Sequence, residues 1–440
     1  MRLSVFLRWN KSHYKQFEPP FEIPDSWEWC QVEDIFELNP KNSASDTSLC
    51  GFIPMALVQD GFGFSHSYER RVWRDVKKGY SHFQNGDIGI AKISPCFENR
   101  KSTIFYGLPN GIGAGTTELT ILRPIIVDAE FYLYLFQSIW YITEGTKDFT
   151  GVVGQQRVNK EIFTSLVIPI PPIAEQKRIA TEIKHYFHFV ELIEYNKDTL
   201  IRNTLTTKSK ILELAMQGKL VPQDPTDEPA AEMLKRINPN AKIITNTPHS
   251  RNIPNGWCLC ELRDLCTFLS RGKSPKYSDV PNKYPVFAQK CNLKDGGISL
   301  NQARFLDEST LPKWPNKYKL KDQDILVNST GTGTVGRTRL FLNKYLKEFP
   351  FVVPDSHVSV VRTFDEIDSK FIYFNLISRE GQTYFNDNLS GSTNQKELYI
   401  EAIGNKLIFL PPKKETERII TKIEELYHCI YKIEATLLSC

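Results

Sequence analysis

The sequence lacks any apolar run long enough to cross a bilayer. Its longest aromatic-rich stretch, Phe131–Tyr141, falls well short of the ~20 residues that a membrane-spanning helix needs. Residues 1–9 include two arginines but neither an extended apolar region nor a cleavage site of small residues, so no secretion signal is predicted. These absences lead us to expect a cytoplasmic protein.

Paired cysteines and a strong net charge are also missing. The nine cysteines are odd in number and have no paired spacing, which suits a reducing compartment. The net charge of +4 permits nucleic-acid binding, but a chain that held DNA alone through its phosphates would usually be more basic. With 41% hydrophobic and 24% charged residues the composition is that of a folded protein, and 440 residues predict two or three domains.

The most prominent feature that is present is a long predicted helix between Pro171-Pro172 and Gly218. Proline at the start and glycine just past the end are typical of helix boundaries. Residues with a 3.5-residue period form a coiled-coil seam, apolar at Ile179, Ile183, Tyr186, Val190, Ile193, Leu200, Ile211 and Leu214 and polar at Lys197, Thr204 and Thr207. The helix would be a rod of roughly 65 Å, which should hold two parts of the chain apart.

The sequence also contains a tandem duplication. The motif Ile23-Pro24-x-x-Trp27 recurs as Ile253-Pro254-x-x-Trp257, and residues 150–172 match residues 390–412 without a gap. We therefore predict two globular halves, each followed by a helix. Short strand-like and helical runs are mixed within each half, which indicates α+β domains.

The second predicted helix begins at Pro411-Pro412 and has its own heptad seam, formed by Ile419, Ile423, Leu426, Ile430, Ile433 and Leu437. Antiparallel pairing of the two seams would place the globular halves at opposite ends. Because the second helix is shorter, part of the Lys197–Leu214 seam would stay uncovered, so a partner subunit or a second copy of the chain (self-association) could pack there. Residues 219–250 are rich in proline and aspartate and are predicted to form a connector with one short helix.

These motifs resemble those of the specificity subunit of type I restriction–modification systems. The resemblance is carried by the two I-P-x-x-W motifs, Gly86–Ile88, Pro171–Ile179 and Ile211–Ala230, and it covers nearly the whole chain. It implies an α+β fold in which two tandem α/β target recognition domains are separated by two long conserved helices forming an antiparallel coiled coil. The predicted segments are an irregular segment (1–19), recognition domain 1 (20–170), a central spacer helix (171–218), a connector (219–250), recognition domain 2 (251–410) and a C-terminal spacer helix (411–440).

The same resemblance implies a non-catalytic subunit that recognises a bipartite double-stranded DNA target, one half-site per domain, with half-sites about one DNA turn apart. The helices would dock two methyltransferase subunits, and restriction (motor–nuclease) subunits would join for cleavage. No cofactor is expected on this chain, since S-adenosylmethionine, ATP and Mg would be bound by the partner subunits. The alternative interpretation is a tandem-domain coiled-coil scaffold that binds protein partners.

Two motifs could suggest other chemistry. Gly331-x-Gly333-x-x-Gly336 follows a strand-like run, as in a nucleotide-binding loop, but the residues after it favour a strand over a helix. We therefore predict a polar turn. Four cysteines of the second half lack the spacing of a zinc ribbon and are predicted to be buried thiols: Cys258, Cys260, Cys266 and Cys291. We predict neither a catalytic residue nor a metal site.

Polar loops that differ between the two halves are the predicted DNA contacts, because phosphate contacts can be shared whereas base contacts must differ. In the first domain they are Lys92, Ser94, Asn99, Arg100, Lys101, Thr116, Thr117, Gln155, Gln156 and Arg157. In the second they are Lys290, Asn292, Ser329, Thr330, Arg337, Arg339, Ser356, His357 and Lys396.

Overall fold

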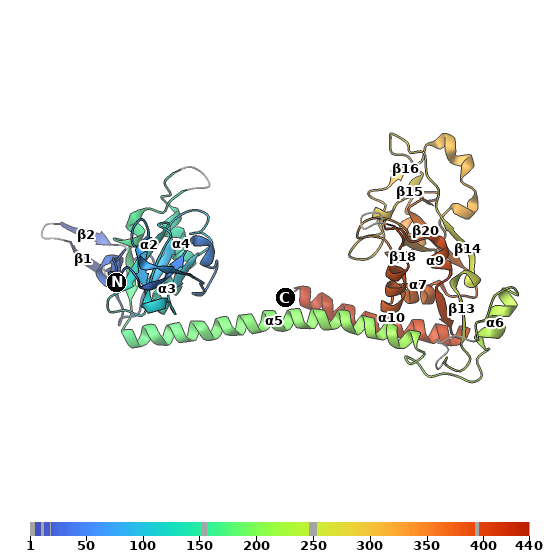
Figure 1. Ribbon diagram of the computed structural model, residues 1–440, viewed down its shortest axis with the longest axis horizontal. Coiled ribbons are helices and arrows are strands. Elements are labelled where there is room, and N and C mark those ends of the chain that lie inside the picture. The colour runs from blue at the N-terminus through green and yellow to red at the C-terminus, as the bar shows by residue number, and fades with distance from the viewer. Residues whose placement is uncertain are drawn as a thin grey trace. The chain divides into compact units, whose positions relative to one another are not determined.

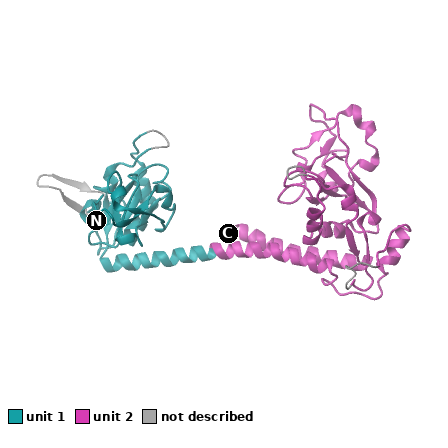
Figure 2. Ribbon diagram, in the orientation of Figure 1, with its two compact units in different colours: residues 1–193 teal, residues 194–440 magenta. Residues whose placement is uncertain are grey.

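The computed structural model describes residues 5–9, 13–17, 19–151, 156–245, 253–391 and 396–439. It divides into two compact units, residues 1–193 and residues 194–440, and the boundary falls within the long helix α5 (Ile173–Met216) (Figure 2). Each unit is described by itself. None of the helices in the described ranges combines the length and the apolar character that a bilayer crossing requires.

The chain begins with strands where the sequence suggested irregular structure. Strand β1 (Val5–Trp9) pairs antiparallel with β2 (His13–Phe17). Both segments are rich in aromatic and aliphatic residues, which favour strands. The expectation of irregular structure is therefore wrong for these two segments.

The first unit is built on two four-stranded sheets. One has the order β4 (Phe36–Leu38), β11 (Leu119–Pro124), β8 (Ile88–Ala91) and β9 (Ser102–Ile104). The other has the order β6 (Glu69–Val72), β5 (Leu49–Ile53), β10 (Ile112–Gly115) and β7 (Ser81–Gln84). Strands β3 (Glu28–Gln31) and β12 (Val167–Ile170) pair separately. The helices before α5 are α1 (Val32–Ile35), α2 (Trp73–Val76), α3 (Ala129–Phe136) and α4 (Ile139–Thr146).

The sheet that contains β8 and β11 is buried on both faces. Leu122 packs into a core with α3, α4 and the start of α5, whereas its neighbour Ile121 packs into a second core with Phe83 and Phe105. Because successive side chains of a strand point to opposite faces, a strand between two cores buries its side chains on both faces. All four side chains of Leu119–Leu122 are accordingly buried, including the polar Thr120 at 4% exposure.

The second unit repeats this plan. Its main sheet has the order β14 (Cys266–Arg271), β20 (Val358–Thr363), β17 (Ile325–Asn328) and β18 (Thr338–Leu340). A smaller sheet joins β16 (Arg304–Phe305), β15 (Pro285–Phe287) and β19 (Val353–Pro354), and β13 (Cys258–Glu261) pairs with β21 (Leu407–Leu410). The helices are α6 (Ala230–Ile237), α7 (Ser369–Ile377), α8 (Arg379–Asp387), α9 (Ile400–Gly404) and α10 (Lys413–Ser439).

A matched ion pair supports the main sheet of each unit. Asp87 accepts two hydrogen bonds of 2.9 Å from the guanidinium of Arg123, and Asp324 accepts two of 2.7 Å from Arg362. Both carboxylates are buried, at 1% and 0% side-chain exposure. A buried carboxylate needs this two-pronged partner, because an unpaired charge inside a protein is costly. The duplication seen in the sequence is thus a duplication of the framework.

Helix α10 runs antiparallel to the last turns of α5 within the second unit (Figure 1). The carboxylate of Glu434 accepts hydrogen bonds from Thr204 (2.9 Å) and Lys208 (2.7 Å), while the hydroxyl of Tyr427 donates to the carbonyl of Lys208 (3.2 Å). The predicted coiled-coil pairing is therefore confirmed, and the polar position Thr204 of the seam is buried at this contact.

The connector packs onto the second unit rather than standing apart. Ala230, Met233 and Leu234 of α6 are buried in its core, and the backbone N–H of Ala230 donates to the carbonyl of Gly256 (2.8 Å). The side chain of Asp227, only 2% exposed, is ion-paired with Arg418 of α10 at 2.7 Å.

Candidate nucleic-acid interface

In the second unit, the glycine-rich segment after β17 forms a turn that leads into β18. Gly331, Gly333 and Gly336 have φ angles of +107°, +72° and +79°, in the left-handed region that favours glycine. A Cβ at Gly331 would lie 2.1 Å from the side-chain oxygen of Gln289, so any other residue would also displace this side chain. A strand, not a helix, follows, so the N–H groups of a helix N-terminus are not available to phosphates here.

The two arginines after this turn bind the loop that contains Asn292. The guanidinium of Arg337 donates to the carbonyl of Asn292 (2.7 Å), and that of Arg339 donates to the carbonyls of Leu293 (2.5 Å) and Gly297 (3.3 Å). Burial lowers the pKa of Arg339. Most donors of Arg339 are therefore engaged by its own domain, and its contact with DNA stays a prediction.

Two other predicted residues of the second domain lie inside it. Asn292 and Ser329 are both 0% exposed. The amide of Asn292 donates to Asn328 (2.7 Å), and the hydroxyls of Ser329 and Ser359 are 2.6 Å apart. Such contacts position the loop ends, and neither side chain faces solvent.

The remaining predicted residues of this domain gather around the ends of β17 and β20. Thr330 is hydrogen-bonded to Nδ1 of the exposed His357 (2.8 Å) and forms a β-bridge with Glu397, which follows the exposed Lys396. Exposed Lys290 follows Gln289, whose carbonyl accepts a hydrogen bond from Asn328 (3.1 Å) at the end of β17. The structure thus brings together the predicted residues Lys290, Thr330, Ser356, His357 and Lys396.

Arg271, at the end of β14, belongs to this cluster but was not predicted. Its guanidinium donates to the carbonyl of Ser356 at 2.7 and 3.0 Å and is ion-paired with Glu397. Glu397 lies within the matched segment 390–412, at the position of Arg157 in the other copy, but nothing in the sequence places Arg271 beside it. The contact between Arg271 and Glu397 is set by the register in which β14 pairs within the main sheet.

The first unit places its predicted residues at the same point of the repeat. The N–H of Lys92 donates to the carbonyl of Glu118 (3.0 Å), and the N–H of Val158 donates to the carbonyl of Lys92 (2.9 Å). The second unit has the same two bonds, from Ser329 to His357 and from Leu398 to Ser329, both 2.8 Å. Lys92, Glu118 and Arg157 therefore correspond to Ser329, His357 and Glu397.

At these matched positions the two units carry different chemistry. In the first, Arg157 pairs with Glu118 through two hydrogen bonds (2.8 and 3.2 Å), and Glu118 was not among the predicted residues. In the second unit, the imidazole of His357 is hydrogen-bonded to the hydroxyl of Thr330, and the carboxylate of Glu397 forms an ion pair with Arg271. The frameworks match while the exposed groups differ, which is the arrangement expected of two readers with different half-sites.

Several predicted residues of the first domain have partners within it. The side chain of Arg100 donates to the carbonyl of Gln137 (2.8 Å) and lies over the ring of Phe62, and Lys101 is 3.4 Å from Asp60. Ser94 donates to Glu98 (2.7 Å). Asn99 and Thr117 are exposed, Gln156 and Thr116 are half-buried, and Gln155 lies outside the described residues.

Cysteines 258, 260 and 291 are buried, and Cys266 is half-buried, as predicted for structural thiols. Within the described ranges, no three or more histidine, cysteine, aspartate or glutamate side chains come together as metal ligands.

Comparison with known families identifies both halves. The sequence profile described as "Type I restriction modification DNA specificity domain" matches residues 24–202 and 254–439. The chain is 32% identical to the type I restriction enzyme EcoAI specificity subunit of Escherichia coli, with 95% of this chain and 80% of that one aligned. It is 31% identical to the EcoEI specificity subunit of Escherichia coli, covering 96% and 81%.

Solved structures show the same fold. A chain of a type I R-M system superposes with a TM-score of 0.61 at 16% identity, covering 96% of this chain and 95% of that one. The HsdS subunit from Thermoanaerobacter tengcongensis superposes with a TM-score of 0.61 at 15% identity, covering 95% and 93%. These similarities span both units and the helices that follow them.

Proposed function

The chain belongs to the family of type I restriction–modification DNA specificity subunits, and we propose that it selects the DNA target of such a complex, with each recognition domain reading one half of a bipartite site. The observation that carries the proposal is the difference between matched positions on a common framework. Glu118 and Arg157 in one domain stand where His357 and Glu397 stand in the other. If the two domains had the same side chains at these positions, they would be expected to recognise the same half-site sequence.

We also propose that the chain is non-catalytic and acts with partner subunits. Methyltransferase subunits, two in number, would bind S-adenosylmethionine and modify the adenine in each half-site after flipping it out of the helix. Restriction subunits would bind ATP and Mg and join for cleavage. The small net charge supports this division of labour, because a chain of +4 gains little affinity from DNA phosphates without help.

Domain exchange tests the proposal. Residues 20–170 are replaced by the corresponding domain of a relative with a known target, and the assembled complex is assayed by mapping methylated adenines in genomic DNA. We expect one half-site to change and the other to stay the same. A change in both half-sites, or in neither, would contradict the division of the target between two domains.

A further inference from the structure

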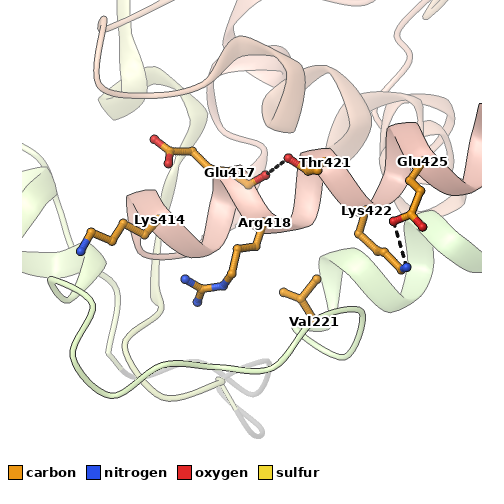
Figure 3. Close-up of a pocket in the computed structure, with 7 residues that line it drawn as sticks. All are labelled: Val221, Lys414, Glu417, Arg418, Thr421, Lys422 and Glu425. Carbon is orange, nitrogen blue, oxygen red and sulfur yellow. Dashed lines mark hydrogen bonds and ion pairs between the residues drawn. The ribbon is translucent and has the colours of Figure 1, made fainter.

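Ion pairs on the surface of this chain are of two kinds. Lys422 and Glu425 lie three positions apart on α10, with their charged atoms 3.0 Å apart (Figure 3). Such a pair forms wherever its helix forms. Arg157 and Glu118, by contrast, are 39 residues apart in the sequence and are brought together by the fold of the first unit. A pair of this second kind holds a charged group at one defined place on the domain surface.

The second unit has a pair of the same kind at the matched position, with the charges reversed. Arg157 exchanges two backbone hydrogen bonds with Thr150 (2.8 and 3.0 Å), and Glu397 exchanges the same two with Ser390 (2.8 and 2.9 Å). The residue at this place is therefore cationic in one unit and anionic in the other. Glu397 is ion-paired with Arg271, which is 126 residues away in the sequence.

The guanidinium of Arg157 is held along one edge. Its Nε and Nη2 donate to the two carboxylate oxygens of Glu118, at 3.2 and 2.8 Å. The edge formed by Nη1 and the second hydrogen of Nη2 is not used by this pair. Because the side chain is 57% exposed, that edge can reach a molecule outside the domain. Two parallel donors match the O6 and N7 acceptors that guanine presents in the major groove of DNA.

Arg271 holds the carboxylate of Glu397 in a comparable way. Its Nε and Nη2 donate to the carbonyl of Ser356 at 3.0 and 2.7 Å, and its Nη1 pairs with Oε1 of Glu397. Arg271 is thus engaged on both sides by its own domain and acts as a positioning residue. Oε2 of Glu397, which this pair does not use, can accept a further hydrogen bond. Since a carboxylate repels phosphates, its use at a DNA interface is to accept from a base amine.

Cytosine is the base that such a carboxylate fits. The N4 amine is the polar group that cytosine presents in the major groove, whereas the N6 amine of adenine lies beside N7, an acceptor that a carboxylate would repel. We propose, on the basis of the function proposed above, that Arg157 recognises a guanine in one half-site and Glu397 recognises a cytosine in the other. Glu118 and Arg271 hold these two groups in position before DNA binds.

Substitution at the matched position tests the assignment. Methylation mapping first gives the natural target, and exchange of residues 20–170 shows which half belongs to the first domain. The assembled complex is then titrated with duplexes that differ from the target at one base pair each. In Arg157→Ala we expect discrimination at one G·C pair of the first half-site to fall about tenfold or more, because a paired donor contact is lost. Glu397→Ala should have the same effect at one G·C pair of the second half-site.

Base analogues identify which base of each pair is contacted and need no variant protein. A guanine analogue without N7 should weaken binding of the natural complex at the Arg157 position and have little further effect in Arg157→Ala. At the Glu397 position the same analogue should be harmless, whereas a cytosine analogue without the N4 amine should weaken binding. An effect of the guanine analogue there would overturn the assignment of cytosine.

The positioning residues have a test of their own. Glu118→Gln and Arg271→Gln should loosen discrimination at the same two base pairs as Arg157→Ala and Glu397→Ala, which a loss of stability alone would not do. Arg71→Ala is the matched control. The guanidinium of Arg71 donates to the carboxylate of Glu69 through Nε (3.2 Å) and Nη2 (2.7 Å), and removing this exposed pair should leave discrimination in both half-sites unchanged.

The outcomes separate this assignment from the proposed function. If Arg157→Ala and Glu397→Ala lower affinity equally for every duplex, or leave it unchanged, while domain exchange still alters one half-site, the assignment is wrong and the two-domain function stands. If either variant alters discrimination in both half-sites, the division of the target between the domains is wrong, and the assignment fails with it.

Discussion

At the scale of single residues, exposure separates the predicted DNA contacts into two groups. Lys290, His357 and Lys396 face solvent, whereas Asn292 and Ser329 are fully buried in hydrogen-bonded positions. A buried polar side chain is held by its partners and gives a loop its shape. An exposed one has donors available for phosphates or base edges. The two groups should respond differently to substitution.

Removal of the exposed lysines should weaken DNA binding without changing sequence preference. For Lys290→Ala and Lys396→Ala in the assembled complex, we expect the slope of log affinity against log salt to become shallower by about 0.9 for each phosphate that the protein no longer neutralises. Titration of labelled target DNA at several salt concentrations measures this slope. Lys219→Ala, on the connector, is the control and should leave the slope unchanged. If the slope is also unchanged in Lys290→Ala and Lys396→Ala, these two lysines do not contact DNA phosphates.

Substitution of Ser329 should act on stability. Ser329→Ala leaves the buried hydroxyl of Ser359 without its 2.6 Å partner, which costs about 1–3 kcal/mol of the free energy of unfolding. Urea denaturation measures this change in stability. We expect the second half-site to be read as before by the folded protein. A variant of natural stability with altered base preference would show instead that Ser329 reaches the DNA.

The sequence could indicate which loops carry the site but not which side chains face outward. Residue type alone does not distinguish exposed Lys290 from buried Asn292, two positions further along the chain. Likewise Glu118 and Arg271 were missed because their partners, Arg157 and Glu397, come from distant segments brought together by strand register. Contacts of this kind exist only in the folded chain.

At the scale of elements, strong local patterns predicted the structure well. The helix expected between Pro171 and Gly218 is α5, and the strand-like run Ile325–Asn328 is β17. The aromatic-rich stretch Phe131–Tyr141 is divided between α3 and α4, because the hydroxyl of Ser138 caps a new helix by accepting a hydrogen bond from the N–H of Tyr141. Strand β10, Ile112–Gly115, has two glycines and no alternating pattern to reveal it.

The contact between α5 and α10 should depend on pH. Hydrogen bonds and charge from Lys208, with a hydrogen bond from Thr204, hold the pKa of Glu434 below its usual value of 4.5. A carboxylate with a lowered folded-state pKa stabilises the fold above its unfolded pKa, and this stability is lost as the pH falls through the folded value. We expect Glu434→Gln to cost about 1 kcal/mol at pH 7 and much less near pH 3.

Thermal denaturation at the two pH values measures the Glu434 effect. Glu425→Gln is the matched control on the same helix. Glu425 forms an exposed ion pair with Lys422, and none of the described ion pairs joins Glu425 to α5. The control should lose little stability at either pH. Equal losses of stability at pH 7 and pH 3 for Glu434→Gln would rule out the ion pair as the source of its effect.

At the scale of the whole molecule, the duplicated framework predicts that one domain can stand in for the other. Both units have the same order of strands in the main sheet and the same buried aspartate–arginine pair. A chain in which residues 253–410 are replaced by a second copy of residues 23–170 should therefore fold and assemble. Methylation mapping should show a target whose two halves carry the same recognised sequence. A complex that still reads the natural second half-site would contradict this.

The antiparallel contact of α5 with α10 also has a mechanical consequence. The part of α5 that pairs with α10 begins near Thr204, and this end lies next to the C-terminal part of α10, since Glu434 contacts Thr204 and Lys208. Force applied at these two adjacent ends would peel the helices apart one turn at a time, with the Glu434 hydrogen bonds breaking first. Force applied at opposite ends would load every interaction between the helices in shear at once. A partner that pulls on both helices from the Glu434 end would thus release them at the lower force.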